Sequence, residues 1–203
     1  RFTGLEGHGS APDRGVNAVE YAVRYAARLM ALADQLRTRA PAQAHFDPPW
    51  TTVNIGRLTG GAVHNVIPAQ AELDWEMRPV QPGDAGFVKE ALSRYVTEEL
   101  LPAMRAVSPH ADIATEVIGE VTGLLPEDTN AARDLVALLT GETEARTVPF
   151  GTEAGLFQEM GLSVVLCGPG SIAQAHMADE FITRPQLARC VDMLDRMTPH
   201  LCA

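Results

Sequence analysis

The sequence predicts an α/β protein, in which a ferredoxin-like βαββαβ domain of the α+β kind is followed by part of a layered α/β domain. Two observations predict this class. Segments with strand and helix periodicity follow one another in the order β, α, β, β, α, β as far as residue 118, the order of a split βαβ sheet. After Gly119, helical and short apolar segments alternate, as they do around a parallel sheet. We therefore expect two domains, residues 1–118 and residues 119–203.

The first two elements are a short strand and a long amphipathic helix. Residues 1–5 read as a strand, and because the first residue is Arg1 instead of methionine, we expect the chain to begin inside a larger protein. From residue 16 to about residue 39, apolar side chains recur at helical spacing, with polar side chains opposite them. The stripe expected to face the core consists of Val16, Val19, Val23, Ala26 and Met30.

Two strands and a second helix complete the predicted sheet. Residues 50–58 are rich in β-branched side chains and end near a Gly-Gly pair, and residues 70–78 alternate between apolar and charged side chains. The second helix begins after Pro82 and is expected to end near Pro102, because proline lacks the N–H that a helix interior needs. A last strand is expected at about residues 111–118.

In the second half of the sequence, helices and strands are predicted to alternate one by one along the chain. We expect helices at residues 129–139, after Thr152 and from Pro185 to the end, and strands near residues 145–148 and at 163–167. The sequence of the last segment, Ser-Val-Val-Leu-Cys, is typical of a strand that is buried on both faces. The sequence therefore indicates part of a parallel sheet with helices on its faces.

Composition excludes several classes of partner. The 203 residues carry a formal net charge of −10, which argues against nucleic acid, because binding a phosphate backbone requires clustered basic side chains. No apolar run approaches the roughly 20 residues that span a bilayer, so no membrane segment is expected. The three cysteines are odd in number and lack Cys-x-x-Cys spacing. Free thiols are typical of a reducing compartment, so we expect a cytoplasmic protein.

Two histidines stand in glycine-rich loops. His176 follows a Gly-Pro-Gly turn and precedes Asp179 and Glu180, a setting in which a neutral imidazole can ligate a metal. The alternative is an ordinary loop histidine beside acids that cap a helix. His8 lies between Gly7 and Gly9, which let a ligand approach closely, so it could stabilise an oxyanion. The alternative for His8 is an exposed turn histidine.

Three further positions are candidates for substrate contacts. Asn65 precedes a strand and serves either a turn or a substrate. Arg78 ends the alternating strand and could grip a substrate carboxylate with its planar fork, or it could form a cross-strand charge pair. Gly151 and Thr152 lie in a strand-to-helix turn whose amides could receive an anion, although Thr152 could equally cap the helix.

Taken together, these motifs resemble the co-catalytic zinc amidohydrolases, the family of acetylornithine deacetylase, succinyl-diaminopimelate desuccinylase and aminoacylase. The resemblance covers nearly the whole chain and follows the same order of motifs. The segments that carry it are residues 7–12 (Gly-His-Gly-Ser-Ala-Pro), 15–18 (Gly-Val-Asn-Ala), 65–69 (Asn-Val-Ile-Pro-Ala), 75–78 (Trp-Glu-Met-Arg), 151–154 (Gly-Thr-Glu-Ala) and 175–180 (Ala-His-Met-Ala-Asp-Glu).

The resemblance implies a role for each candidate residue. The ferredoxin-like domain would be a lid, through which two copies form a homodimer, and His8 would reach the active site of the partner subunit to stabilise an oxyanion. Asn65 would help from the same lid. Arg78 and the turn at Gly151 and Thr152 would hold the substrate, and His176 would ligate one of two zinc ions, with cobalt as the alternative metal. The reaction implied is hydrolysis of an N-acyl amino acid, N-acetylornithine first among them.

The chain also departs from the family pattern. The amino-terminal half, which supplies the other metal ligands in this family, is absent, so the resemblance leaves His176 as the one family ligand present. We expect the chain by itself to be inactive and to bind zinc poorly, because one imidazole does not make a closed site. Two alternatives stay open. One is a sibling deacylase or dipeptidase of the same family, and the other is a non-catalytic small-molecule-binding or dimerisation module of ferredoxin-like fold.

Overall fold

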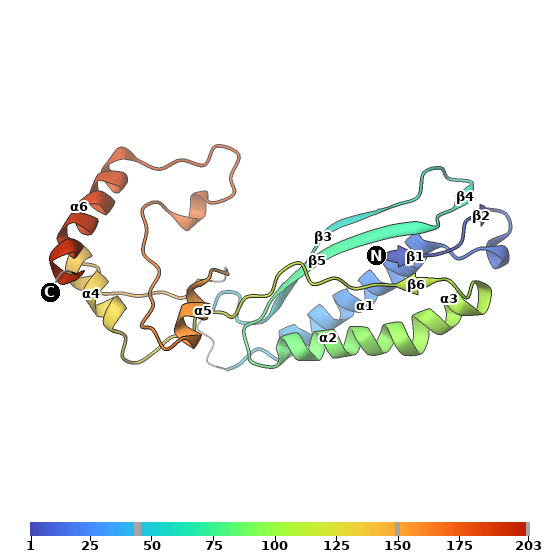
Figure 1. Ribbon diagram of the computed structural model, residues 1–203, viewed down its shortest axis with the longest axis horizontal. Coiled ribbons are helices and arrows are strands. Elements are labelled where there is room, and N and C mark those ends of the chain that lie inside the picture. Colours follow the sequence, from blue (N-terminus) through green and yellow to red (C-terminus); the bar gives the residue numbers. More distant parts are fainter. Residues whose placement is uncertain (43–45, 149–150, 202–203) are drawn as a thin grey trace. The chain divides into compact units, whose positions relative to one another are not determined.

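A computed structural model describes residues 1–42, 46–148 and 151–201. The chain divides into two compact units (Figure 1). The first unit contains Arg1–Glu120, and the second contains Val121–Thr147 and the described residues from Gly151 onward.

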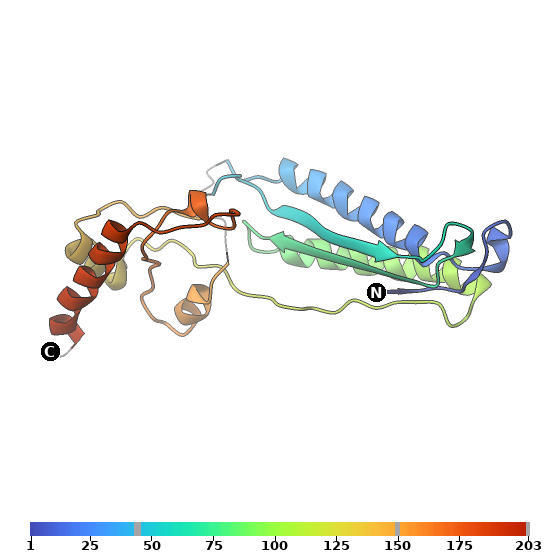
Figure 2. The same cartoon turned by 90° about the horizontal axis from the view of Figure 1, so that it is seen from above.

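The first unit is built on a four-stranded antiparallel sheet. The strand order is β3-β5-β1-β6, so the first strand lies between the third and the fourth, which confirms the predicted βαββαβ arrangement. Figure 2 shows the long helices alongside the sheet. The strands and helices of this layer are β1 (Phe2–Thr3), α1 (Ala18–Thr38), β3 (Thr52–Gly60), β5 (Gln70–Arg78), α2 (Asp84–Tyr95) and β6 (Asp112–Ile113).

Helix α1 supplies much of the core, and the predicted stripe is confirmed at Val16 and Ala26, which are buried. Its N-terminus is capped by Asn17, whose side chain accepts a hydrogen bond from the Glu20 N–H at 3.1 Å. The expected stripe was wrong at Val23 and Met30, which are 50% and 55% exposed. The helix carries two apolar stripes, and the one with three leucines and a tyrosine buries more apolar area. The residues buried on it are Ala18, Ala22, Tyr25, Ala26, Leu29, Leu32 and Leu36.

The central strand β1 is short and depends on one aromatic contact. The side chain of Phe2 is 2% exposed, and its ring meets that of Tyr25 edge-on, with centroids 5.7 Å apart at 79°. Edge-to-face packing is a favoured geometry for aromatic rings. The contact holds the middle of the sheet against α1.

A bulge at Gly56 decides which side chains of β3 face the core. Ile55 pairs with Trp75 while Arg57 pairs with Asp74, so Gly56 is an extra residue on this strand. The extra residue moves Arg57 onto the polar face of the sheet, where it reaches Asp74 at 3.2 Å. Without the bulge, the pleat would turn the Arg57 side chain toward the helices.

The second helix does not end near Pro102, contrary to the expectation from proline. Helix α2 passes into a π-helical turn, Val96–Leu100, and then into α3 (Leu101–Val107). The N–H of Leu101 donates to the Val96 carbonyl, five residues back, so the bonding pattern restarts at this point. Pro102 therefore occupies the first turn of α3, where its missing N–H leaves no bond unmade.

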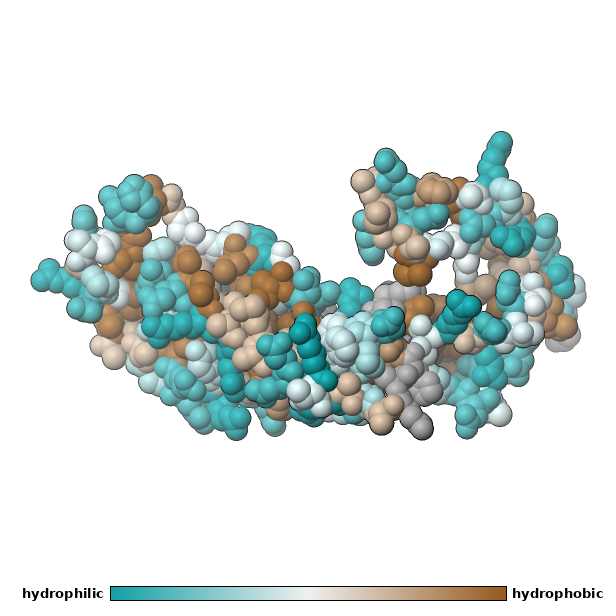
Figure 3. Space-filling view, turned by 180° about the vertical axis from the view of Figure 1, so that it is seen from behind, coloured by the Kyte–Doolittle hydropathy of each residue, from teal (hydrophilic) through white to brown (hydrophobic). Residues whose placement is uncertain are grey.

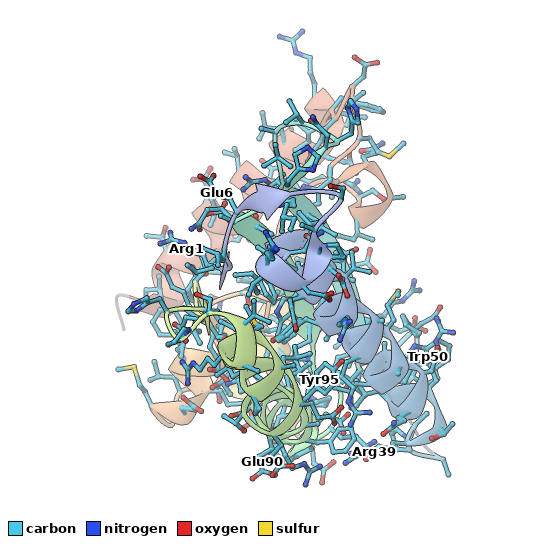
Figure 4. All side chains as sticks on the ribbon, turned by 90° about the vertical axis from the view of Figure 1, so that its right-hand side faces the viewer. Arg1, Glu6, Arg39, Trp50, Glu90 and Tyr95 are labelled. Carbon is cyan, nitrogen blue, oxygen red and sulfur yellow. The ribbon has the colours of Figure 1, made fainter. Side chains whose placement is uncertain are left out.

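A buried polar cluster ties the ends of four elements together. Thr51 and Asp84 are each 1% exposed; the Thr51 hydroxyl donates to Asp84 and accepts from the Val80 N–H at 2.9 Å. The other carboxylate oxygen of Asp84 lies 3.3 Å from Nη2 of Arg39, whose guanidinium stacks over the Phe87 ring at 4.3 Å. Figure 4 shows Arg39 beyond the end of α1. The cluster joins the end of α1, the start of β3, the turn after β5 and the start of α2.

The second unit has the predicted helices but lacks the predicted strands. Its helices are α4 (Ala131–Thr140), α5 (Ala154–Glu159) and α6 (Arg184–Leu201). No strand is assigned at residues 145–148 or 163–167, or elsewhere among the described residues of this unit, so both strand predictions were wrong for this chain. A strand requires a neighbour to complete its backbone hydrogen bonds, and the described residues here supply none.

Side-chain amides replace strand pairing in the second unit. The Gln158 side chain accepts from the Leu125 N–H at 2.8 Å and donates to the Leu125 carbonyl at 2.9 Å. Asn130 caps α4 through the Arg133 N–H at 2.9 Å and donates to the Val164 carbonyl at 2.9 Å. These bonds hold Leu125 to α5 and Val164 to the start of α4.

Tyr25 should make the first unit sensitive to alkali. Burial raises the pKa of Tyr25 above its ordinary value of 10.0, partly offset by hydrogen bonds with Thr115 and Trp75. The unfolded chain therefore ionises first, and folding stability should fall as the pH rises from 10.0 toward the folded pKa. Urea unfolding at about pH 9 and about pH 11 should show a smaller alkaline loss in Tyr25→Phe than in the wild type. Equal losses would contradict this assignment.

Thr51→Val should destabilise the first unit, because it leaves the Val80 N–H and one Asp84 oxygen unpaired. The expected cost is about 1–3 kcal/mol for each buried group left without a partner. Both tryptophans, Trp50 and Trp75, belong to this unit, so urea unfolding followed by tryptophan fluorescence reports on it. The control is Thr59→Val, an exposed threonine on β3, the strand that Thr51 directly precedes, for which we expect a change within about 0.5 kcal/mol. Similar losses in the two variants would refute a special role for Thr51.

Candidate functional site

His8 lies on a small ribbon at one end of the first unit. Strand β2 (Gly7–His8) pairs with β4 (Val66–Ile67), and a 3-10 turn, Pro12–Arg14, completes the loop (Figure 1). The base of the loop is closed by two backbone bonds between Leu5 and Val16, 3.0 and 2.9 Å long. Only glycine fits beside this closure, because a Cβ on Gly4 would lie 2.0 Å from the Val16 carbonyl oxygen.

The ribbon brings two of the predicted residues, His8 and Asn65, to the same place. The N–H of Gly9, directly after His8, donates to the Asn65 carbonyl at 2.8 Å. A side chain at Gly9 would crowd that carbonyl, since its Cβ would lie 3.0 Å from the oxygen. The side chains of His8 and Asn65 are both exposed. Both side chains are therefore accessible at this end of the unit.

The imidazole of His8 makes its hydrogen bonds locally. Its Nδ1 lies 2.8 Å from the hydroxyl oxygen of Ser10, and the backbone N–H of Ser10 donates to the same Nδ1 at 3.2 Å. The turn that makes these contacts is closed by the Ala11 N–H, which donates to the His8 carbonyl at 2.9 Å. Within the described residues, both bonds of the ring are therefore at Nδ1.

A cavity of about 380 Å³ lies beside this ribbon. Its lining combines the loop after His8, the first turns of α1 and the hairpin before β4. Polar or aromatic groups in the lining include Asp13, Asn17, Glu20, Tyr21 and His64. Glu20 is paired within α1, with its carboxylate 2.5 Å from Nη2 of Arg24.

Arg78 lies at the other end of β5, opposite Thr52. Eight residue steps separate it from Gln70, about 27 Å at the rise of an antiparallel strand. Its Nε and Nη2 both lie 3.2 Å from Oε1 of Glu76. This carboxylate lies on the same strand, two residues before Arg78. The sheet keeps Arg78 well apart from His8.

Gly151 and Thr152 belong to the second unit, just before α5. The Thr152 hydroxyl accepts a hydrogen bond from the Ala154 N–H at 3.1 Å, but the N-cap residue of α5 is Glu153, which makes no side-chain capping bond. Gly151 is exposed, and Thr152 is half-buried. The turn can serve the helix and still present backbone groups to solvent.

His176 also belongs to the second unit and is exposed. It is the one non-glycine residue with positive φ, 62°, among those described, and its N–H donates to the Glu180 carboxylate at 3.0 Å. A left-handed residue outside glycine is uncommon and calls for local support, which Glu180 provides. No group of three or more His, Cys, Asp or Glu side chains in the described residues could hold a metal ion. The described residues alone therefore do not fit a complete metal site.

Comparison with known proteins identifies the first unit. Residues 1–104 match the M20 family described as the peptidase dimerisation domain, which is about half of the chain. This chain belongs to the M20 peptidase dimerisation family. The match covers the sheet strands β1, β3 and β5 and both long helices, and it includes His8, Asn65 and Arg78.

Curated M20-type relatives resemble the chain throughout. It is 34% identical over 206 residues to an acetylornithine deacetylase of Myxococcus xanthus and 34% identical over 203 residues to one of Erwinia tasmaniensis. These matches cover 98% and 100% of this chain but 50% and 51% of the two relatives. The chain thus spans about half the length of the curated relatives it matches.

Solved structures show the same fold at low identity. A Staphylococcus aureus tripeptidase aligns with a TM-score of 0.60 at 18% identity, over 95% of this chain and 48% of that one. An enzyme described as a putative aminohydrolase, from methicillin-resistant Staphylococcus aureus, aligns with a TM-score of 0.61 at 16% identity, over 96% and 48%. Among the described residues, no helix is both long and apolar enough to cross a membrane.

Sequence reasoning missed two features of this M20 chain. Ser10, two residues after His8, was not singled out, although a serine hydroxyl commonly bonds to groups two residues away. The Thr51–Asp84 pair was also missed, because the two residues are 33 positions apart and nothing local marks them as neighbours. Both contacts could be recognised only once the three-dimensional fold was known.

Proposed function

We propose that this chain is part of an enzyme that hydrolyses the N-acyl amide bond of an N-acylated amino acid, with N-acetylornithine as substrate and ornithine and acetate as products. The observation that carries the proposal is the 34% identity to acetylornithine deacetylase over 98% of the chain. Because the chain spans half of that relative, the activity is proposed for the complete protein. The chain by itself is expected to be inactive.

In this proposal, His8 stabilises the oxyanion that forms when the amide carbonyl is attacked. Hydrogen-bond donors aimed at developing negative charge are among the largest contributions to catalysis. The exposed pair of His8 and Asn65 supports such a role, since both side chains are accessible to a group outside their own unit. We assign them to the active site of the partner subunit in a homodimer.

Arg78 and the turn at Gly151 and Thr152 are proposed to hold the amino-acid portion of the substrate. Arg78 already holds a carboxylate, that of Glu76, through Nε and Nη2. This contact supports carboxylate recognition by the same fork. A substrate carboxylate would replace Glu76 or share the guanidinium with it.

His176 is proposed as a metal ligand of the complete enzyme, which we expect to use two zinc ions, with cobalt as the alternative. The exposed imidazole on a supported left-handed residue is the feature of this chain that supports the role. A bound metal supplies an activated water as nucleophile. The remaining ligands are assigned to the part of the relatives that this chain does not cover.

The homodimer is proposed to form through the first unit, which we take as a lid domain of residues 1–118, with residues 119–203 as part of the catalytic domain. Val23 and Met30 leave an apolar stripe exposed on α1, and β3 lies at the edge of the sheet in the described residues. Figure 3 views this side of the unit, where brown apolar side chains gather. An exposed apolar stripe next to an open strand edge is typical of an association surface.

A cytoplasmic location is part of the same proposal. Cys167 and Cys190 are free thiols, which supports a reducing compartment.

The activity test uses the complete protein that contains this chain, with zinc added, on N-acetylornithine. We expect hydrolysis, a loss of about 10²–10³ in kcat for His8→Ala as an oxyanion donor is removed, and a loss at least as large for His176→Ala. The control is His110→Ala, an exposed histidine outside the candidate site, which should leave activity unchanged.

The outcomes separate the alternatives. Turnover of other N-acyl amino acids or dipeptides in place of N-acetylornithine would indicate a sibling enzyme of the family. No turnover of any of these compounds would favour the non-catalytic binding or dimerisation module.

The dimer test uses this chain in sedimentation velocity. The wild type should sediment as a dimer at micromolar concentration, and Val23→Glu with Met30→Glu should sediment as a monomer, because charges on an apolar contact remain unpaired. The control is Val117→Glu, an exposed valine that follows β6 at the opposite edge of the sheet. A monomeric wild type, or dissociation by the control alone, would count against this surface.

A further inference from the structure

The contacts at His8 restrict the position of the proton on its ring. A neutral imidazole carries one proton and one free lone pair, on opposite nitrogens. The Ser10 backbone N–H points at Nδ1 from 3.2 Å, and a backbone N–H can only donate. Nδ1 must therefore be the acceptor, and the proton of the neutral ring lies on Nε2.

The Ser10 hydroxyl acts in the same direction. Its oxygen lies 2.8 Å from Nδ1, close enough for an O–H···N hydrogen bond. Because Nδ1 has no proton to give while it accepts from the N–H, the hydroxyl must be the donor. Two donors from one residue thus converge on one ring nitrogen.

We propose that Ser10 is a positioning residue, which holds the neutral His8 ring as a hydrogen-bond donor through Nε2–H. The proposal rests on the proposed function for its catalytic consequence. A ring held in this tautomer can donate to an oxyanion. It cannot accept a proton or bind a metal through Nε2 unless the contact with the Ser10 N–H breaks and the Ser10 hydroxyl turns to accept from Nδ1.

The local backbone explains why residue 10 can do this. The turn from His8 to Ala11 is closed by a 2.9 Å hydrogen bond and folds Ser10 back over the ring of His8. The tip is also held from outside, by the 2.8 Å bond from Gly9 to Asn65. The ring orientation is therefore set by a hydrogen-bonded turn, and Nε2 of the exposed side chain, which has no bond within the described residues, is left for a ligand.

The first test is ¹⁵N NMR of the histidine rings in this chain at neutral pH. Through-bond correlations should show the His8 Nδ1 as an unprotonated nitrogen and Nε2 as protonated. In Ser10→Ala, which keeps the backbone N–H but loses the hydroxyl, the population of the other tautomer should increase. A wild-type ring with its proton on Nδ1 would overturn the proposal.

The second test is kinetic and uses the complete protein. Ser10→Ala should lower kcat about five- to tenfold, the size of one neutral hydrogen bond, with KM unchanged and with recovery in Ser10→Thr. In a His8→Ala background, Ser10→Ala should have no further effect, because its action passes through His8. The control is Ser93→Ala, an exposed serine on α2, which should match the wild type.

The two tests separate this proposal from the proposed function. The NMR result does not depend on turnover, so a fixed Nε2–H tautomer in a protein without deacylase activity would retain the role of Ser10 and reject the enzyme. Deacylase activity with equal kcat in Ser10→Ala and wild type, or equal losses with and without His8, would retain the enzyme and reject the role of Ser10.

Discussion

The backbone bridge between Leu5 and Val16 is the constraint on which the candidate lid site depends. Its two hydrogen bonds join the end of β1 to the approach to α1 and close the intervening loop. The Ala18 N–H then donates to the Pro68 carbonyl at 2.8 Å, and the Gly4 N–H to the Ala69 carbonyl at 2.8 Å. Sheet, helix and the chain before β5 are thereby fixed at one point. The ribbon that carries His8 extends from it.

Sequence periodicity predicted the elements of the first unit because one face of each element packs against the core and the other faces water. Strand β5 alternates cleanly, and its bounds agree with the prediction. Periodicity failed where one helix carries two apolar stripes that the sequence alone does not rank, as on α1. There, tertiary packing buries the leucine stripe and leaves Val23 and Met30 exposed. It failed again at residues 163–167. An apolar run indicates that a segment is suited to burial, but strand formation also requires a neighbouring strand to pair with it.

Sequence motifs nominated the candidate residues but did not predict the neighbours of those residues. His8 and Asn65 are 57 positions apart, and their approach depends on the pairing of β2 with β4, two strands of two residues each. Such short strands leave no periodic signal. The contact of Arg78 with Glu76 and the double contact of Ser10 likewise depend on rotamers and turn geometry. These contacts could be identified only from the three-dimensional structure.

The loop around His8 is held almost entirely by main-chain groups: the bridge at its base, the Gly9–Asn65 bond at its tip and the turn that closes at Ala11. Hydrogen bonds between main-chain groups can form whichever side chain most of these residues carry. Exposed loop positions such as Glu6, Asp13 and Arg14 can therefore change over evolution with little displacement of the imidazole. The loop can in this way change its charge and shape while the imidazole stays in place.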